Sequence, residues 1–141
     1  MDRMNVSTGP LANIRVLVVE DDPDLLHSIR EALVHDYRVT ACVSGHEALQ
    51  AMAEGQRFDV LVTALRLLDM DARTLLDGIE EHDATLRRNA LLIAEQRLSI
   101  EDEEFVDEGH ARVMFAPLRP LRLRQEVEAL AVHAARLMLA I

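Results

Sequence analysis

Residues Val16–Leu26 read VLVVEDDPDLL, and this segment points most directly to the architecture of the chain. The apolar run Ile14–Val19, which is rich in Val, is typical of a buried parallel strand. Asp22 then offers an N-cap and Pro23 occupies the first helical position, which predicts a helix that runs to about His35. The segment therefore predicts a strand, an acidic turn and a helix in immediate succession.

The same alternation of an apolar run and an amphipathic stretch recurs along the chain. Further strands are expected at Arg38–Val43, Asp59–Ala64, Ala90–Ala94 and Arg112–Phe115. Further helices are expected from the capping box at Ser44 and Glu47 to Ala53, then at 72–82, at 100–108 and from Pro120 onward. Strands that alternate with helices predict an α/β fold, with a parallel sheet covered by helices on both faces.

Length and composition limit the classes of protein that remain. The chain has 141 residues, which suits one domain, and its 50% hydrophobic content excludes a disordered protein. Cys42 is the single cysteine, so a disulfide scaffold is excluded. Every apolar run is too short to span a bilayer, and the first residues lack the apolar segment of a signal peptide. We therefore expect a cytoplasmic protein without a membrane partner.

The charge pattern excludes further functions. The net charge is −10 and aromatic residues make up 3% of the chain, so a nucleic-acid partner is not expected. All 15 basic residues are Arg, which rules out a P-loop lysine, a Schiff base or a lysine general base. The six His residues show no metal-ligand spacing. No Ser-His-Asp or Cys-His arrangement is apparent either, and an enzyme is not expected.

Four segments in order resemble the response-regulator receiver domain family, over about residues 14–132. They are VLVVEDDPDLL (Val16–Leu26), SGHEAL (Ser44–Leu49), FDVLVTALRLLDMD (Phe58–Asp71) and FAPL (Phe115–Leu118). The resemblance implies a flavodoxin-like, doubly wound, five-stranded parallel sheet of order 2-1-3-4-5. Residues 1–13 are then an N-terminal tail, and residues 133–141 extend the last helix beyond the receiver-like domain.

Receiver domains take a phosphoryl group from a phospho-histidine kinase onto an Asp at the end of the third strand. The resemblance places the two metal-binding acids on Glu20 and Asp21, the phosphoacceptor on Ala64, the phosphoryl-binding hydroxyl on Ala94 and the Lys on Ala116. A methyl group has no lone pair with which to attack phosphorus, and Ala94 and Ala116 supply neither a donor nor a cation. The resemblance therefore identifies a pocket of receiver type without its chemistry.

Further positions of the family pattern have changed as well. The switch aromatic falls on Val113, and Leu68 and Ala72 replace the Pro and Gly of the loop after the acceptor. Asp69 and Asp71 lie on that loop, where no strand fixes them as substitute acceptors. Mg²⁺ usually needs carboxylates together with phosphate oxygens, so Glu20 and Asp21 are expected to bind it weakly at most, and no cofactor is expected.

The remaining function is expected on surfaces. Residues 101–108 are acidic without a basic residue, and Arg112, Arg119, Arg122 and Arg124 follow without an acidic one. Either the two stretches pair with each other, or they form a surface of two signs that orients a partner. The end of the last helix, AARLMLAI, adds an exposed apolar stretch suited to a partner or a homodimer. The expected interaction surface comprises Glu101, Glu104, Phe105, Glu108, Arg119, Arg122, Leu137 and Ile141.

Three functional hypotheses follow. The first is a non-phosphorylatable receiver-like module that binds a signalling partner, namely a histidine kinase, another receiver or an output protein. The second is a phospho-dead variant of an ordinary single-domain response regulator, since the three alanines could be replacements; the changes at Leu68, Ala72 and Val113 favour a natural origin. The third is a cyclic-dinucleotide sensor that uses Arg66 and Asp69, whose four-residue pattern arises often by chance.

Overall fold

The strands form one parallel sheet in the order β2-β1-β3-β4-β5, as predicted. The computed structural model describes residues 9–109 and 111–140, and its five strands lie within them. Their bounds are β1 (Arg15–Val19), β2 (Arg38–Cys42), β3 (Val60–Ala64), β4 (Ala90–Ala94) and β5 (Arg112–Phe115). Strand β1 lies between β2 and β3, with Val16 opposite both Val39 and Val60. The α/β fold of flavodoxin-like order is therefore confirmed.

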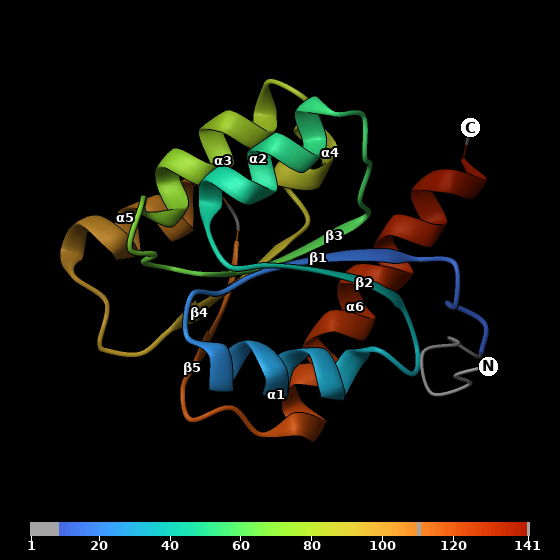
Figure 1. Cartoon of the computed structure of the whole chain (residues 1–141), viewed down its shortest axis with the longest axis horizontal. Coiled ribbons are helices and arrows are strands. Elements are labelled where there is room, and N and C mark those ends of the chain that lie inside the picture. Colours follow the sequence, from blue (N-terminus) through green and yellow to red (C-terminus); the bar gives the residue numbers. More distant parts are fainter. Residues whose placement is uncertain (1–8, 110, 141) are drawn as a thin grey trace.

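Helices cover both faces of the sheet (Figure 1). Their bounds are α1 (Pro23–Leu33), α2 (Gly45–Ala53), α3 (Ala72–Glu80), α4 (Ala84–Arg87), α5 (Ile100–Gly109) and α6 (Pro120–Leu139). Helices α1 and α6 lie on one face, and α2 and α3 lie on the other, with α4 and α5 beside them. The sequence did not predict α4, because a helix of four residues is too short to show a period.

Two hydrophobic cores form because successive side chains of a strand point to opposite faces. Leu17 and Val19 of β1 pack beneath α2 and α3, whereas Val16 and Val18 pack against α1 and α6. Every residue of β3 and β4 is buried, as expected for strands inside a sheet that is covered on both sides. The carboxyl ends of these central strands are thus held by packing on both faces.

Side-chain caps fix where two helices begin, close to the carboxyl ends of the strands. The Asp22 carboxylate accepts hydrogen bonds from the backbone N–H groups of Asp24 and Leu25, and Pro23 follows as predicted. The Ser44 hydroxyl accepts a hydrogen bond from Glu47 N. Each cap satisfies an N–H group that has no partner within its helix, so the turns after β1 and β2 are well defined.

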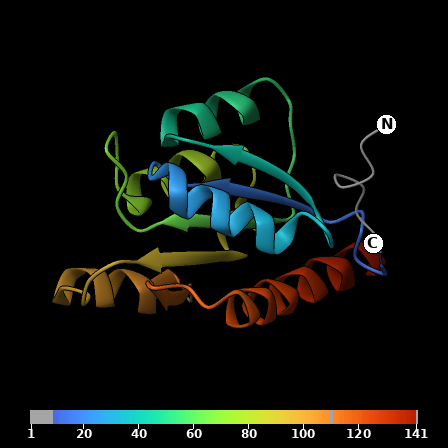
Figure 2. The ribbon, with the colours of Figure 1, turned by 60° about the horizontal axis from the view of Figure 1, so that its bottom comes forward.

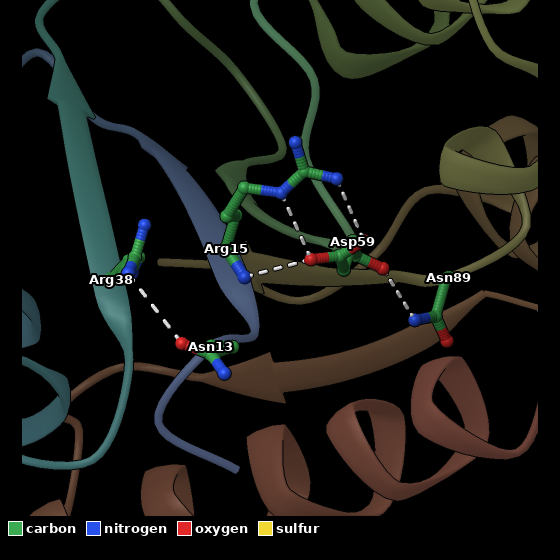
Figure 3. Close-up of polar contacts among 5 residues, drawn as sticks. All are labelled: Asn13, Arg15, Arg38, Asp59 and Asn89. Carbon is green, nitrogen blue, oxygen red and sulfur yellow. Dashed lines mark hydrogen bonds and ion pairs between the residues drawn. The ribbon is translucent and has the colours of Figure 1, made fainter. Parts of the chain in front are cut away.

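A polar cluster closes the opposite, amino edge of the sheet (Figure 3). Arg15 forms an ion pair with Asp59 at 3.3 Å, and its backbone N–H donates to the same carboxylate at 2.8 Å. Asn89 donates from its amide to the carbonyl oxygens of Asp59 at 2.8 Å and Leu130 at 3.0 Å. Arg38 reaches Asn13 at 3.5 Å. This cluster joins the strands to α6 at the edge remote from the candidate site.

Helix α6 is the longest helix of the described chain. Its 20 residues span about 30 Å, and Figure 2 shows its last turns reaching past the ends of the strands. Leu123, Val127, Leu130, Ala131 and Ala134 are buried, whereas Leu137, Met138 and Leu139 are exposed. Ile141 lies outside the described residues. No helix in the described part of the chain has the length and apolar character needed to cross a membrane.

Candidate functional site

A hollow of ≈ 330 Å³ opens at the carboxyl edge of the sheet. Strand β1 leads into it with Glu20 and Asp21, β3 ends in it with Ala64, and β4 ends in it with Ala94. The remaining lining residues are Leu65, Arg66, Ile93, Glu95, Gln96, Arg97, Ser99 and Asp102. Four of the five pocket residues expected from the sequence therefore lie around one cavity.

Glu20 is the most enclosed charged side chain of this hollow, with 3% of its surface exposed. Its Oε2 accepts a hydrogen bond from Asp22 N at 3.1 Å. Burial raises the pKa of the Glu20 carboxyl above its ordinary value of 4.5; the bond from Asp22 opposes this rise, and the carboxylates of Asp21 and Glu95 add to it. The hollow thus holds a carboxylate that is costly to ionise.

Asp21 has a different role, because it holds the loop between β3 and α3. Its Oδ2 accepts a hydrogen bond from Leu68 N at 2.6 Å. A short bond between a carboxylate and a backbone N–H is a strong contact. One oxygen of Asp21 is therefore already occupied by the chain itself, and the loop that follows β3 is drawn toward the loop that follows β1.

The reactive positions of the hollow carry methyl groups. Ala64 is 6% exposed and Ala94 is 2% exposed, so both of these lining residues are buried and contribute only a methyl group to the hollow. Thr63 is buried, lies outside the lining and donates its hydroxyl to the Ala64 carbonyl at 3.1 Å. Ser99, the hydroxyl residue of the lining, accepts a hydrogen bond from Asp102 N at 3.1 Å and thereby caps α5. Neither hydroxyl is placed to act as a substitute acceptor.

The last two positions of the family pattern lie beside the hollow. Ala116 follows β5 and donates its backbone N–H to the Ala94 carbonyl at 2.9 Å, and its bond to Pro117 is cis. Ala116 is half-buried and is not part of the lining. Val113 is half-buried against the core beneath α2 and α3. Position 116 is thus next to the hollow, but its methyl group cannot serve as a cation there.

Asp69 and Asp71, the two acids of the loop, serve as helix caps rather than as pocket residues. Asp69 accepts hydrogen bonds from Gly45 N at 3.1 Å and His46 N at 2.9 Å, at the start of α2. Burial alone would raise the pKa of Asp69, but these backbone bonds outweigh it and lower the pKa. Asp71 accepts from Thr74 N at 2.9 Å, and this bond is the main cause of its lowered pKa.

A divalent metal ion, which the resemblance implies for the acidic pair, finds a poor donor set here. Glu20 and Asp21 each have one oxygen engaged by a backbone N–H group. In the described residues, no group of three or more His, Cys, Asp or Glu side chains is arranged to hold a metal ion. The residues present therefore do not fit a resident Mg²⁺ site.

The structure adds residues to the hollow that the sequence did not single out for it. Arg66 forms an ion pair with Asp102 at 2.7 Å, and both side chains line the wall beside α5. Glu95 directly follows β4, so its place at a strand end could have been foreseen. The pairing of Arg66 with Asp102 could not, because 36 positions separate them and only the packing of α5 brings them together.

The expected interaction surface is exposed in part. Glu101, Glu104, Glu108, Arg119, Arg122 and Leu137 are exposed. The prediction for Phe105 is wrong, because Phe105 is only 7% exposed and belongs to the core beneath α2 and α3. It is the large apolar side chain that α5 turns inward, and the Arg73 guanidinium lies 4.6 Å from the centre of its ring.

The acidic and basic stretches do not neutralise each other within the described residues. Arg112 and Arg122 pair with Glu126, and Arg124 pairs with Asp36. On α5, Asp102 forms an ion pair with Arg66, which belongs to neither stretch. The alternative in which the two stretches pair with each other is therefore wrong for the described part of the chain. Among the described residues, Glu104 and Arg119 are exposed members of the two stretches that form no ion pair.

Arg66 and Asp69, the two residues considered for binding a cyclic dinucleotide, contact different helices. Arg66 contacts α5 through Asp102, whereas Asp69 contacts the first turn of α2. The structure therefore gives these two side chains separate contacts within the chain.

Comparison with known proteins defines the class. Residues 16–128 match the model of the response regulator receiver domain, and the chain belongs to this family. Two curated relatives are the two-component response regulator ARR2 of Arabidopsis thaliana, 37% identical over 70 residues, and the sensor histidine kinase TmoS of Ectopseudomonas mendocina, 39% identical over 67 residues. Each match takes in 48% of this chain but only 10% and 7% of those proteins, so the chain spans a small part of their length.

Solved structures show the same fold. A CheY-like response regulator receiver domain protein of Methanospirillum hungatei JF-1 aligns with a TM-score of 0.78 at 20% identity, over 89% of this chain and 98% of that one. A response regulator receiver protein of Sinorhizobium medicae WSM419 aligns with a TM-score of 0.73 at 21% identity, over 89% and 99%. The protein is thus a receiver domain of two-component signalling in fold and family.

Proposed function

We propose that this receiver domain is a non-phosphorylatable interaction module, which acts in two-component signalling by binding a partner protein. The carrying observation is that Ala64, at the end of β3, presents a methyl group to the hollow where an acceptor carboxylate would have to stand. Phosphoryl transfer needs a nucleophile held in line together with charge stabilisation, and the methyl groups at Ala94 and Ala116 supply neither. On this proposal the protein is not an enzyme.

The nearby carboxylates support the proposal, because each has another role in the fold. Glu20 is buried and Asp21 holds the loop after β3. Asp69 and Asp71 cap α2 and α3. Moving either capping aspartate into the hollow would leave backbone N–H groups of a helix without a partner. Using either aspartate as a substitute phosphoacceptor would therefore cost the free energy of its helix cap.

Exposed apolar side chains at the same edge support a role in binding. Leu68, in the loop after β3, is 94% exposed. Other exposed apolar residues at or near the carboxyl ends of the strands are Val43, Ile100, Phe115 and Leu121. Apolar side chains gathered on one part of a surface are a common sign of a protein interface. The partner classes we propose are a histidine kinase, another receiver and an output protein.

Intact-mass measurement tests the proposal. The protein is incubated with acetyl phosphate and Mg²⁺, and we expect no species heavier by about 80 Da, the mass of one phosphoryl group, because no nucleophile faces the hollow. The matched variant restores the reactive groups as Ala64→Asp, Ala94→Thr and Ala116→Lys, and is expected to gain that mass. A phosphorylated wild-type chain, with the group on Asp69 or Asp71, would overturn the proposal.

A further inference from the structure

Helix α5 is fastened to the rest of the protein by few side chains. Phe105 is the one buried residue of α5 across 100–109, all of which the structure describes. Six of the other positions in α5 are acidic and none is basic; they are Glu101, Asp102, Glu103, Glu104, Asp107 and Glu108. A helix with so little buried apolar surface opens more easily than the strands, so its remaining contacts decide how tightly it stays in place.

Two arginines from the segment after β3 supply these contacts. The Arg66 guanidinium binds Asp102 at 2.7 Å. The Asp102 side chain is 18% exposed and the Arg66 side chain is 63% exposed, so water screens the pair from the arginine side. The Arg73 guanidinium lies 4.6 Å from the centre of the Phe105 ring, within the range of a cation–π contact. Both contacts join the same two segments, one near the start of α5 and one at its middle.

The contact between Arg66 and Asp102 is also part of the hollow, since both residues line it together with Glu20, Asp21 and Ala64. Asp102 belongs to the first turn of α5, where its N–H donates to the Ser99 hydroxyl at 3.1 Å and its carboxylate accepts from Ser99 N at 3.4 Å. One ion pair therefore forms the wall of the hollow and fixes the first turn of the acidic helix.

We propose that the ion pair between Arg66 and Asp102 is a latch that holds α5 against the sheet. Its release opens α5 and uncovers Phe105 with the partly buried Leu98 and Val106, which gives a partner an apolar surface that the closed form hides. A basic partner surface releases the latch when it competes with Arg66 for Asp102. This inference concerns how α5 is held, so it does not depend on whether the hollow accepts a phosphoryl group.

Hydrogen exchange of the full chain, followed by mass spectrometry, tests the latch. In Arg66→Met and in Asp102→Asn we expect the amides of α5 to exchange about fivefold faster, with β1 and β3 unchanged. The double variant is expected to exchange no faster than either single variant, because each substitution removes the same interaction. Arg97→Met is the matched control, since Arg97 also lines the hollow but has no ion pair within the described residues.

Three outcomes at low salt would overturn the latch. They are unchanged exchange of α5 in Arg66→Met, additive effects in the double variant, and an equal effect of Arg97→Met. If Arg66→Met loses its fold as a whole, β1 and β3 also exchange faster, and Asp102→Asn then decides. Raising the salt from about 0.05 M to about 1 M screens the ion pair of the wild type, so the difference in α5 exchange between wild type and variant is expected to shrink. A difference that does not shrink with salt contradicts the latch.

Discussion

Glu20 and Asp69 show how the surroundings of a carboxyl group set its pKa in this protein. Glu20 faces the hollow with a raised pKa, and Asp69 caps α2 with a lowered one. The opposite directions follow from surroundings: Glu20 is mainly desolvated, whereas Asp69 receives two backbone hydrogen bonds. Each direction gives a dependence of stability on pH that can be measured.

Glu20→Gln is expected to stabilise the protein at neutral pH, because it removes the cost of holding a buried charge. Since the folded pKa of Glu20 is raised, the fold binds this proton more tightly than the unfolded chain does. Glu20 therefore contributes stability below the ordinary pKa of 4.5, and that contribution is lost as the pH rises through the folded pKa. Urea unfolding between about pH 4 and pH 8 should show the gap between variant and wild type closing toward acid. If Glu20→Gln is less stable than the wild type at neutral pH, the ionised Glu20 carboxylate does not destabilise the fold.

Asp69→Ala is expected to cost about 1 kcal/mol at neutral pH, since two N–H groups at the start of α2 lose their acceptor. The pKa of Asp69 is lowered in the fold, so its contribution is present above the ordinary value of 3.8 and is lost as the pH falls through the folded pKa. Asp107→Ala is the control, because the Asp107 side chain is exposed and forms no hydrogen bond or ion pair within the described residues. Equal loss in both variants, measured by thermal unfolding, would argue against a capping role.

Among the elements, α6 is joined to the amino edge of the sheet by a buried amide as well as by its apolar side chains. Asn89 donates to the carbonyl oxygen of Asp59 (Figure 3) and to that of Leu130. Its side chain is enclosed, since the residue is 2% exposed. Asn89→Ala leaves the part-buried Asp59 carbonyl and the buried Leu130 carbonyl without these donors, and is expected to cost about 2 kcal/mol in urea unfolding. Asn13→Ala, at an exposed position of the same edge, should change stability little. If Asn89→Ala and Asn13→Ala are equally stable, Asn89 does not contribute to the attachment of α6.

The sequence predicted elements whose signals are local. The strand and helix around Asp22 depend on apolar runs and caps that neighbouring residues supply, and these elements are confirmed. Phe105 was predicted on a surface because an acidic helix gives no clear apolar face, and only the packing of α5 shows that this ring turns inward. The contacts of Arg66 with Asp102 and of Asp69 with α2 were also missed, since each joins residues far apart in the chain.

For the whole molecule, charge is divided between two neighbouring surfaces. Helix α5 is acidic, and β5 with the start of α6 carries exposed arginines, among them Arg119 and Arg122. Phe115 and Leu121, which are exposed, belong to the same β5–α6 segment as these arginines. A two-fold interface needs a surface that is complementary to itself, and neighbouring surfaces of opposite sign can meet that requirement when two copies face each other. A second copy of the chain is thus one partner that this surface fits.

We expect the wild-type chain to self-associate through this surface at low salt and to dissociate as salt is raised, because exposed charges are screened. The double variant Arg119→Glu with Arg122→Glu places acidic side chains opposite the acidic α5 and is expected to be monomeric in sedimentation velocity. The double variant Glu104→Arg with Glu108→Arg leaves four acidic residues on α5, so its dimer is expected to be weaker than that of the wild type. Mixing the two variants brings opposite charges together at both halves of a two-fold interface, so the mixture is expected to regain the dimer. Leu139→Ser, at an exposed residue near the end of α6, is the control and should leave the charge-dependent association unchanged. If the mixture stays monomeric while the wild type dimerises, the contact lies elsewhere, and loss of the dimer in Leu139→Ser would place it at the end of α6.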